Sequence, residues 1–513
     1  MKQSRKVIVK NIDQILDIGI ALSAEKSYDR ILEMILEQAR SFTKADAGTL
    51  YLCEGNSLIF KVLQNDSMDI GTMSLHTDSK LPVLPINKKS AAGYAAISGE
   101  IINISDVYNS EKFDFAGPKL YDKLTGYKTI SMLVVPLKNS KDKVLGVLQI
   151  INARDDNGNI IPFTKDYNKV ISSLASQAAI TLTNIWHVEQ IKELMHSFVE
   201  SMATAIDART PYNASHTKRV AKLVEKTIEI INTRETGKYK NVFFDQERKE
   251  QLIMAAWLHD IGKIGTPLSV LNKGTKLGDR LELIIQRMDY IKSRMELDFL
   301  KKGYDSEQDK DTEDKYNKKK QLIQNARALI KDLNEPDYNI SVEDEKVLRE
   351  IVNSKYIDED GKERNWISKD EFKSLTIKRG TLTAEEREMV EKHVEIGLRI
   401  LENIPFPDKL AQVPEFVSMH HELLDGSGYP AGLRDNEIPL EARILAVIDI
   451  FDALTSYDRP YRKASSIEEN LEIMKTMVEE GKLDGNLFSL IQEYKLWEYM
   501  DEYGELVGNF KIG

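Results

Sequence analysis

The chain has 513 residues, which is too long for one ordinary hydrophobic core, so two or three domains are expected. Hydrophobic residues make up 42% and charged residues 30%, a balance typical of globular proteins and not of disordered ones. The net charge of −11 argues against a general nucleic-acid-binding surface, because phosphate backbones select basic faces. We therefore expect no nucleic-acid polymer among the partners.

The composition also bears on the compartment. The single cysteine, Cys53, cannot form a disulfide within the chain, which fits a reducing environment. The basic, polar start at residues 1–10 does not have the pattern of a signal peptide, and no uninterrupted apolar stretch is long enough to span a bilayer. We expect a cytoplasmic protein that does not enter the membrane.

Residues 1–186 have the pattern of an α+β domain. Apolar residues at helical spacing over 11–42 are followed by short β-like runs, of which 144–152 is the strongest, and then by a helix over 164–185. This order predicts an antiparallel sheet with flanking helices.

Three stretches of this region resemble a GAF domain, a sensor module for small ligands. They are Ser90–Ala96, Leu145–Asn152 and Pro162–Asp166. The resemblance covers roughly residues 12–186 and implies an unknown small ligand at this domain. A GAF fold that only dimerises, or that has lost its ligand, is the alternative.

One departure bears on the ligand. GAF domains that bind cyclic nucleotides often carry an Asn-Lys…Phe…Asp-Glu set, and this chain has Asn152 and Phe163. Ala153 stands in place of the lysine, and Asp166-Tyr167 stands in place of the acidic pair. The departure argues against a cyclic nucleotide at this domain.

Residues 171–207 contain no helix breaker, and apolar residues recur there at seven-residue spacing in two columns. The columns are Ile171, Ala178, Ile185, Val199 and Ile206, and Leu174, Val188, Met195 and Met202. This spacing predicts a connecting signalling helix over 187–206, continuous with the helix before it, that pairs with a second copy as a parallel coiled coil. We therefore expect a homodimer. In the alternative, 171–186 packs only on the first sheet and 195–206 begins the next core.

The remaining residues, 207–513, have a helical pattern that is interrupted by an insertion over about 275–378. Long helical stretches and a charge run over 301–320 predict a mainly helical arm there. Within it, Glu359–Lys362 is predicted to form a hairpin turn and Ser368–Glu371 a capping box. Such an arm could pack on the partner, cover a pocket or select the ligand.

Five of the eight histidines fall beside helix ends or turns in this second region, together with two carboxylates. The seven residues are His216, His259, Asp260, His393, His420, His421 and Asp449. Imidazole and carboxylate groups are ligands that divalent metals favour in hydrolytic sites. Seven of them exceed what one catalytic ion takes, so the pattern predicts two ions with Asp260 as the bridge.

These residues closely resemble the HD-GYP family, the subgroup of HD phosphohydrolases that cleaves cyclic dinucleotides, chiefly cyclic di-GMP. The resemblance rests on His259–Lys263, His420–Glu422 and Gly428–Pro430, which occur in family order and precede Asp449. It runs over about 194–274 and 379–490. It implies an all-α domain with two divalent ions, of which iron and manganese are the expected metals.

The resemblance also implies roles by position. One ion would be held by His216, His259, Asp260 and Asp449, and the second by Asp260, His393 and His420, with His421 at or beside the site. The residues that would face the phosphates or bases of the ligand are Lys263, Tyr429, Arg459 and Arg462. Asp260 and Lys263 are the expected catalytic residues, since Lys263 would neutralise charge that develops on the phosphoryl oxygens. Some family members add a third ion through a glutamate just before the first histidine. Tyr212 and Asn213 are the nearby residues here, so we expect two ions.

Taken together, these features predict a metal-dependent phosphodiesterase that hydrolyses cyclic di-GMP or a related cyclic dinucleotide to the linear dinucleotide, to GMP or to both. The GAF-like domain would regulate this activity. Two alternatives stay open. One is a catalytically weak or inactive module that retains metal or nucleotide and signals through protein contacts. The other is an HD phosphohydrolase for another nucleotide, such as cyclic GMP-AMP.

Overall fold

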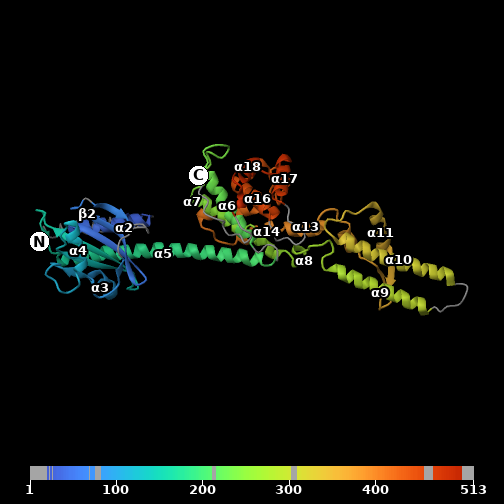
Figure 1. Ribbon diagram of the computed structural model, residues 1–513, viewed down its shortest axis with the longest axis horizontal. Helices are drawn as coiled ribbons and strands as arrows, with labels where there is room; N and C mark the ends of the chain where they lie inside the picture. Colours follow the sequence, from blue (N-terminus) through green and yellow to red (C-terminus); the bar gives the residue numbers. More distant parts are fainter. Residues whose placement is uncertain are drawn as a thin grey trace. The chain divides into compact units, whose positions relative to one another are not determined.

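The computed structural model describes residues 20–21, 24–25, 27–68, 70–74, 83–210, 215–301, 309–455 and 466–499 (Figure 1). The chain divides into two compact units, Met1–Leu194 and Met195–Gly513. The first is a sheet with helices on its faces, and the second is almost wholly helical. The predicted fold class is thus confirmed. The domain boundaries assigned from the sequence stay predictions.

One antiparallel sheet forms the centre of the first unit, with strand order β3-β2-β1-β7-β6-β5. The two short strands β4 and β8 pair with β2 and β7. The strands are β1 (Ala45–Glu54), β2 (Ser57–Asn65), β3 (Ile70–Ser74), β4 (Leu84–Pro85), β5 (Ile102–Ile104), β6 (Met132–Lys138), β7 (Val144–Arg154) and β8 (Ile160–Ile161). Between β1 and β7 the register pairs Leu50 with Leu148 and Tyr51 with Val147. Because successive side chains of a strand point to opposite faces, these two pairs belong to two different cores.

Different helices cover the two faces of this sheet. Helix α2 (Tyr28–Thr43) and the first part of α5 (Lys165–Asp207) pack on the face that carries Leu50. Helix α3 (Ala91–Ser98) packs on the opposite face, where Phe113 and Phe115 are buried beside it. Helix α4 (Ala116–Thr125) lies in the connection between β5 and β6.

Helix α5 continues without a break from the first unit into the second. The predicted seam residues that are buried in the two hydrophobic cores are Ile171, Leu174, Ala178, Val199 and Ile206. For these residues the alternative prediction, packing within the chain's own domains, is the one confirmed. The large apolar side chains of α5 that remain exposed are Ile180, Val188, Ile191, Leu194 and Phe198.

The second unit is built on one helical core. Its helices are α6 (His216–Thr233), α7 (Gln246–Leu258), α8 (Leu268–Leu271), α13 (Ala384–Glu391), α14 (His393–Leu401), α15 (Val413–Ser418), α16 (Leu440–Thr455), α17 (Ile467–Glu479) and α18 (Gly485–Glu493). Short 3-10 helices are η1 (Ile261–Gly265), η2 (Asp408–Leu410), η3 (Asp435–Glu437) and η4 (Leu496–Glu498). Helices α6, α7, α15, α16 and α18 supply most of the buried apolar side chains.

The insertion is mainly helical, as predicted, and has a core of its own around the buried Trp366. Its elements are α9 (Arg280–Lys301), α10 (Asp309–Asn334), α11 (Val342–Asn353), β9 (Lys355–Ile357), β10 (Glu363–Asn365) and α12 (Lys369–Leu375). The predicted hairpin is confirmed by the β9–β10 pairing, and the predicted capping box by the reciprocal Ser368–Glu371 hydrogen bonds.

Two contacts tie the ends of the insertion together. The ammonium of Lys273 lies 2.5 Å from Glu386, and the Thr381 hydroxyl donates to the Lys273 carbonyl at 2.9 Å. Burial lowers the pKa of Lys273, although Glu386 opposes this effect. The same Glu386 caps α13 with Thr383. The arm is therefore fastened at its root to the helix that leads to His393.

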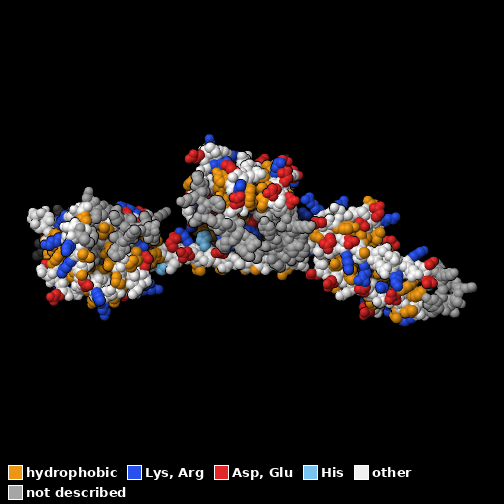
Figure 2. Space-filling model, viewed as in Figure 1, with side chains coloured by type: hydrophobic (Ala, Val, Ile, Leu, Met, Phe, Trp, Pro, Cys, Tyr) orange, Lys and Arg blue, Asp and Glu red, His pale blue; other side chains and the backbone are white. Residues whose placement is uncertain are grey.

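The surface carries many charged side chains of both signs, as the composition leads us to expect. On the face drawn in Figure 2, acidic and basic side chains are interspersed over the described residues. None of the helices in the described parts of the chain has the length and apolar character needed to cross a lipid bilayer.

Candidate metal centre

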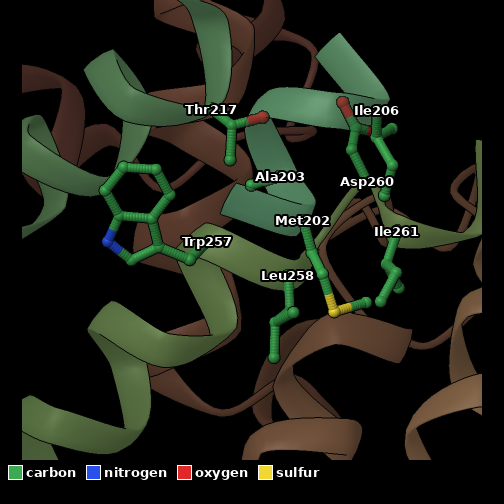
Figure 3. A pocket seen from close by; sticks show the side chains of 8 residues that line it. All are labelled: Met202, Ala203, Ile206, Thr217, Trp257, Leu258, Asp260 and Ile261. Atoms are coloured by element: carbon green, nitrogen blue, oxygen red, sulfur yellow. The ribbon is translucent and has the colours of Figure 1, made fainter. Parts of the chain in front are cut away.

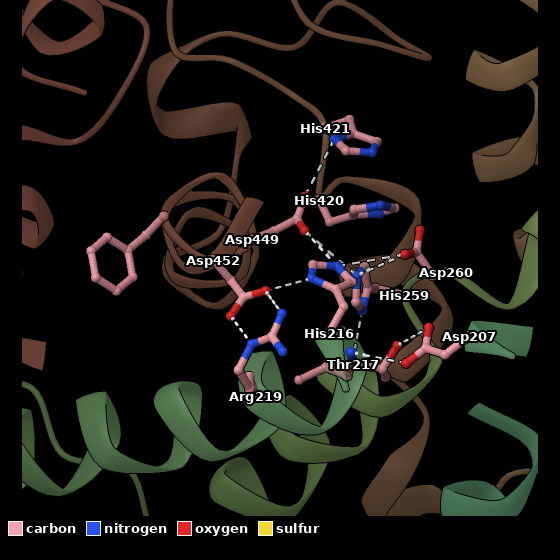
Figure 4. A network of polar contacts seen from close by, with 12 residues as sticks. Asp207, His216, Thr217, Arg219, His259, Asp260, His420, His421, Asp449 and Asp452 are labelled. Carbon is pink, nitrogen blue, oxygen red and sulfur yellow. Dashed lines mark hydrogen bonds and ion pairs between the residues drawn. The ribbon is translucent and has the colours of Figure 1, made fainter. Parts of the chain in front are cut away.

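The seven predicted metal ligands meet in the second unit, and most of them are seen together in Figure 4. His216 begins α6, His259 and Asp260 follow α7, His393 begins α14, His420 and His421 follow α15, and Asp449 lies within α16. The ligand atoms of six of them form two groups, within each of which the atoms lie no more than 4.8 Å apart. One group is His216, His259 and Asp260, and the other is His393, His420 and His421.

Asp260 belongs to the first group and also reaches the second. Its Oδ2 is 3.4 Å from His259 Nε2 and 3.7 Å from His216 Nε2. Its other oxygen, Oδ1, is 3.6 Å from His393 Nε2. Because one carboxylate oxygen faces each group, Asp260 has the geometry of a bridging ligand.

Asp449 lies beside the first group and reaches toward the second. Its Oδ1 is 3.1 Å from His216 Nε2 and 3.7 Å from His259 Nε2, while its Oδ2 is 3.9 Å from His421 Nδ1. In the second group, the Nε2 atoms of His393 and His420 are 3.5 Å apart. The arrangement is that of two adjoining clusters of donors with a carboxylate at each side.

Three of the histidines are held in the same way. The Nδ1–H groups of His259, His393 and His420 donate to the carbonyls three residues earlier, at 2.6–2.7 Å. Each histidine lies at or just after the C-terminal end of a helix, where the last carbonyls lack partners within the helix. These bonds fix the tautomer and leave Nε2 free to bind a metal. Nε2 of His259 is buried and has no hydrogen-bond partner, which fits a bound cation.

The two groups differ in their electrostatics. Burial lowers the pKa of His393 and His420, and it lowers that of His421 to about 4, so these rings are neutral and able to ligate. Burial also opposes charge on His216, but Asp449 and Asp452 outweigh it and raise the pKa of His216 to about 10. The carboxylates thus make the first group the more attractive one for positive charge.

Asp260 is itself held ionised. Burial would raise its pKa, but Lys263 and His259 lower that pKa well below the usual value. The Lys263 ammonium is 2.6 Å from Asp260 Oδ2. Lys263 thus lies in the site, where the structure gives it a contact with the proposed bridge. Its contact with a phosphate stays a prediction.

Close packing sets the position of the His-Asp turn. A Cβ on Gly262 would lie 1.8 Å from the carbonyl oxygen of His393, whereas a Cβ on Gly397 of α14 would meet only ordinary contacts at 3.5 Å. Only glycine lets η1 approach the start of α14 this closely. Arg209 holds the other side of η1 by donating to the carbonyls of Lys263, at 2.7 Å, and Thr266, at 3.2 Å.

The Gly-Tyr-Pro turn lies against the second group. The Tyr429 ring is 4.9 Å from that of His421 between centroids, and its backbone N–H donates to the His421 carbonyl at 3.2 Å. The buried carboxylate of Glu422 accepts three backbone N–H groups from residues 431–433, which fastens the turn. Gly428 has no room for a Cβ, which would lie 2.3 Å from the Leu423 nitrogen. Burial raises the pKa of Tyr429, so its phenol stays neutral.

Some predicted residues fall outside this geometry. Arg459 and Arg462, predicted to bind the ligand, and Tyr212 and Asn213 lie outside the described residues. Three residues that the ligand pattern did not single out contribute to the site: Arg219, Glu422 and Asp452. Helical spacing offered a signal for two of them, because Arg219 lies three residues after His216 and Asp452 three after Asp449.

In the first unit, Asn152 has a structural task. Its amide oxygen accepts from the backbone N–H groups of Ile130 and Ser131, and its amide nitrogen donates to the Lys128 carbonyl and the Tyr127 hydroxyl. These four bonds use the full capacity of an asparagine side chain. Asn152 therefore has no group left for a nucleotide, and a ligand of this unit stays a prediction.

Comparison with known families identifies the two units. The GAF domain model matches residues 27–182, and two HD domain models match residues 213–354 and 370–487. The chain thus joins a GAF domain to an HD domain, as the sequence resemblances predicted.

Curated relatives share shorter segments. The chain is 42% identical over 109 residues to the cyclic di-GMP phosphodiesterase of Thermotoga maritima, which is 21% of this chain and 28% of that protein. It is 43% identical over 99 residues to the cyclic di-GMP phosphodiesterase response regulator RpfG of Xanthomonas campestris, covering 19% and 25%. It is 48% identical over 79 residues to the 3'3'-cGAMP-specific phosphodiesterase 1 of Vibrio cholerae, covering 15% and 18%. Each alignment spans less than a third of the relative.

The close approach of η1 to α14 gives a testable prediction. Gly262→Ala should cost about 1–3 kcal/mol of the free energy of unfolding and weaken metal binding, because the added methyl group pushes Asp260 away from His393. Gly397→Ala in the same interface is the matched control and should be at least as stable as the wild type, with the same metal content, because alanine is the better helix former. Thermal unfolding and metal analysis of the purified proteins measure both quantities. Equal behaviour of the two variants would show that the packing at Gly262 does not set the site.

Proposed function

We propose that the chain is a metal-dependent phosphodiesterase that hydrolyses a cyclic dinucleotide, cyclic di-GMP in the first place, under the control of its GAF domain. The observation that carries the proposal is the position of Asp260, with one carboxylate oxygen toward each of two histidine groups. The names of the relatives support the substrate class. Cyclic GMP-AMP is the second candidate, because one relative is specific for it.

The donor set fits two divalent ions. His216, His259, Asp260 and Asp449 would hold one, and Asp260, His393 and His420 the other, with His421 beside it. When bound, such ions supply Lewis-acid charge to the phosphoryl oxygens and lower the pKa of the attacking water. Imidazole and carboxylate ligands suit iron and manganese, the metals we propose.

The chain's own residues supply the rest of the chemistry. Lys263 brings a positive charge to the bridging carboxylate, where it can also meet a phosphate oxygen. The neutral phenol of Tyr429, beside His421, can donate a hydrogen bond to an anionic ligand. Both groups are partly buried, which strengthens these interactions because water screens them less than at an open surface. Arg459 and Arg462 are proposed as further phosphate contacts.

We propose that the GAF domain acts on the site through α5. The last turns of this helix line a crevice beside the His-Asp turn, where Met202 and Ile206 lie near Trp257 and Ile261 (Figure 3). At its end, the Asp207 carboxylate accepts from the Thr217 backbone at 3.1 Å and from its hydroxyl at 2.9 Å. Thr217 follows His216, so a shift of α5 would be felt by a metal ligand.

We also propose a homodimer through the part of α5 that lies between the two cores. Val188, Ile191 and Phe198 are 52%, 64% and 62% exposed. With the half-buried Met195 they recur at alternating steps of three and four residues, the spacing of a two-helix seam. A face of this kind can pair with an identical face, so we propose that α5 of a second copy of the chain packs against it.

The enzymatic proposal predicts turnover that depends on the His-Asp pair. The wild-type protein, purified with iron or manganese, should hydrolyse cyclic di-GMP in a chromatographic assay over a panel of cyclic dinucleotides. His259→Ala/Asp260→Ala should lower the rate by more than about 100-fold, because even groups that only orient ligands are worth 10–100-fold.

Three results, from this assay and from binding and metal analysis of the same protein, discriminate among the hypotheses. Turnover of cyclic GMP-AMP alone would favour the second substrate. Metal and nucleotide binding without turnover of any dinucleotide would favour a signalling module instead of an enzyme. A metal content near one or near three ions per chain would contradict the two-ion proposal.

The dimer proposal predicts a change of mass. Ile191→Glu/Phe198→Glu should convert a dimer to a monomer in light scattering. Each of the two paired helices would then bring carboxylates into the apolar seam, where they repel one another. Gln190→Glu/His196→Glu introduces two glutamates at exposed positions off the seam and should leave the dimer intact. A wild-type chain that is monomeric at every concentration would refute the proposal.

A further inference from the structure

His216 differs from His259, His393 and His420 in the hydrogen-bond partner of its Nδ1 atom. These three donate Nδ1–H to a carbonyl at a helix C-terminus. His216 is the first residue of α6, and a helix presents free N–H groups and no free carbonyls at its start. Its Nδ1 therefore needs an acceptor from elsewhere. That acceptor is Asp452 of α16, whose Oδ2 lies 2.7 Å away.

Asp452 is held in turn by Arg219. The guanidinium donates from Nε to Oδ1 at 2.7 Å and from Nη2 to Oδ2 at 3.0 Å, a two-bond contact that fixes the plane of the carboxylate. His216, Arg219 and Asp452 are 6%, 7% and 2% exposed, so water does not compete for these bonds. Figure 4 shows the chain of contacts from Arg219 through Asp452 to His216.

Two helices supply this arrangement by the same spacing. On α6, Arg219 lies three residues after His216, and on α16, Asp452 lies three residues after Asp449. Residues three apart share one face of a helix. The packing of α6 on α16 thus brings Asp449 to Nε2 of His216 and Asp452 to its Nδ1.

We propose that Asp452 is a positioning residue for the ion of the first group, and that Arg219 orients Asp452. With an ion bound, Asp452 would fix the tautomer of His216 in which Nδ1 keeps its proton and Nε2 carries the lone pair, and it would make the imidazole a more basic metal ligand. The proposal rests on the proposed metal-dependent function. It implies an asymmetry, because His259, His393 and His420 are fixed by backbone carbonyls and do not depend on Asp452.

Manganese binding to the full-length protein tests this asymmetry. The metal-free chain is titrated with Mn²⁺ by calorimetry, and the spin coupling between neighbouring ions is followed by electron paramagnetic resonance. Asp452→Asn should weaken one Mn²⁺ site by about 10–100-fold, leave the other unchanged and abolish the coupling.

The matched control is Asp484→Asn. Asp484 is also a buried carboxylate of the second unit, bonded to the Tyr239 hydroxyl at 2.9 Å and 3.6 Å from Arg443. Within the described part of the chain, its contacts do not include a ligand of the site. It should lower the melting temperature and keep both Mn²⁺ sites. If Asp452→Asn does not fold, Asp452→Asn/Arg219→Gln removes both buried charges together, so that neither is left unpaired, and should lose the same site.

The outcomes separate this inference from the proposed activity. Wild-type affinity at both sites of the Asp452 variants, or equal loss at both sites, would overturn the positioning role. A wild type that binds two Mn²⁺ ions but hydrolyses no cyclic dinucleotide would overturn the proposed phosphodiesterase activity. The comparison of variants would then still test the positioning role of Asp452. A wild type that binds no Mn²⁺ would overturn both.

Discussion

The buried carboxylate of Asp260 is the group on which the rest of the centre depends. An ionised carboxylate that is only 4% exposed is stable in a protein interior only if positive charge or hydrogen-bond donors surround it. Lys263 supplies such charge on one side, and histidines approach both oxygens. The buried negative charge of Asp260 also attracts cations. The need to neutralise this charge in the folded chain and the capacity to bind metal therefore come from the same carboxylate.

The histidines around this carboxylate are placed by the ends of helices more than by their faces. Helix ends leave carbonyls without partners, and a histidine at such an end satisfies one of them with Nδ1 while its Nε2 points onward. His259, His393 and His420 all use this device. The fixed glycine contact at Gly262 then brings two of these ends together. The chain's own contacts thus hold the donors in place, as a preorganised metal centre requires.

The sequence was sufficient to predict the fold classes of the two units, the helical character of the inserted arm and the clustering of the seven ligand-type residues. Those predictions depended on residue type, spacing and family resemblance, which are properties of the chain itself. It was not sufficient for Asp452, Arg219 and Glu422, because their tasks arise only when α6 packs on α16 or when the Gly-Tyr-Pro turn folds back. A carboxylate that orients a histidine and one that lies on the surface look alike before the helices are packed. Tertiary contact, and no local pattern, distinguishes them.

Helix α5 shows the limit of periodicity most clearly. A seven-residue repeat of apolar side chains is the mark of a coiled coil, but a helix that packs on a sheet or a bundle needs a similar stripe. Ile171 and Leu174 use their stripe in the first core, and Val199 and Ile206 use theirs in the second. The large apolar side chains of α5 that remain exposed are Ile180, and Val188, Ile191, Leu194 and Phe198 between the cores. The pairing proposed for two copies would use the stretch between the cores, through which the proposed signal from the GAF domain would also pass.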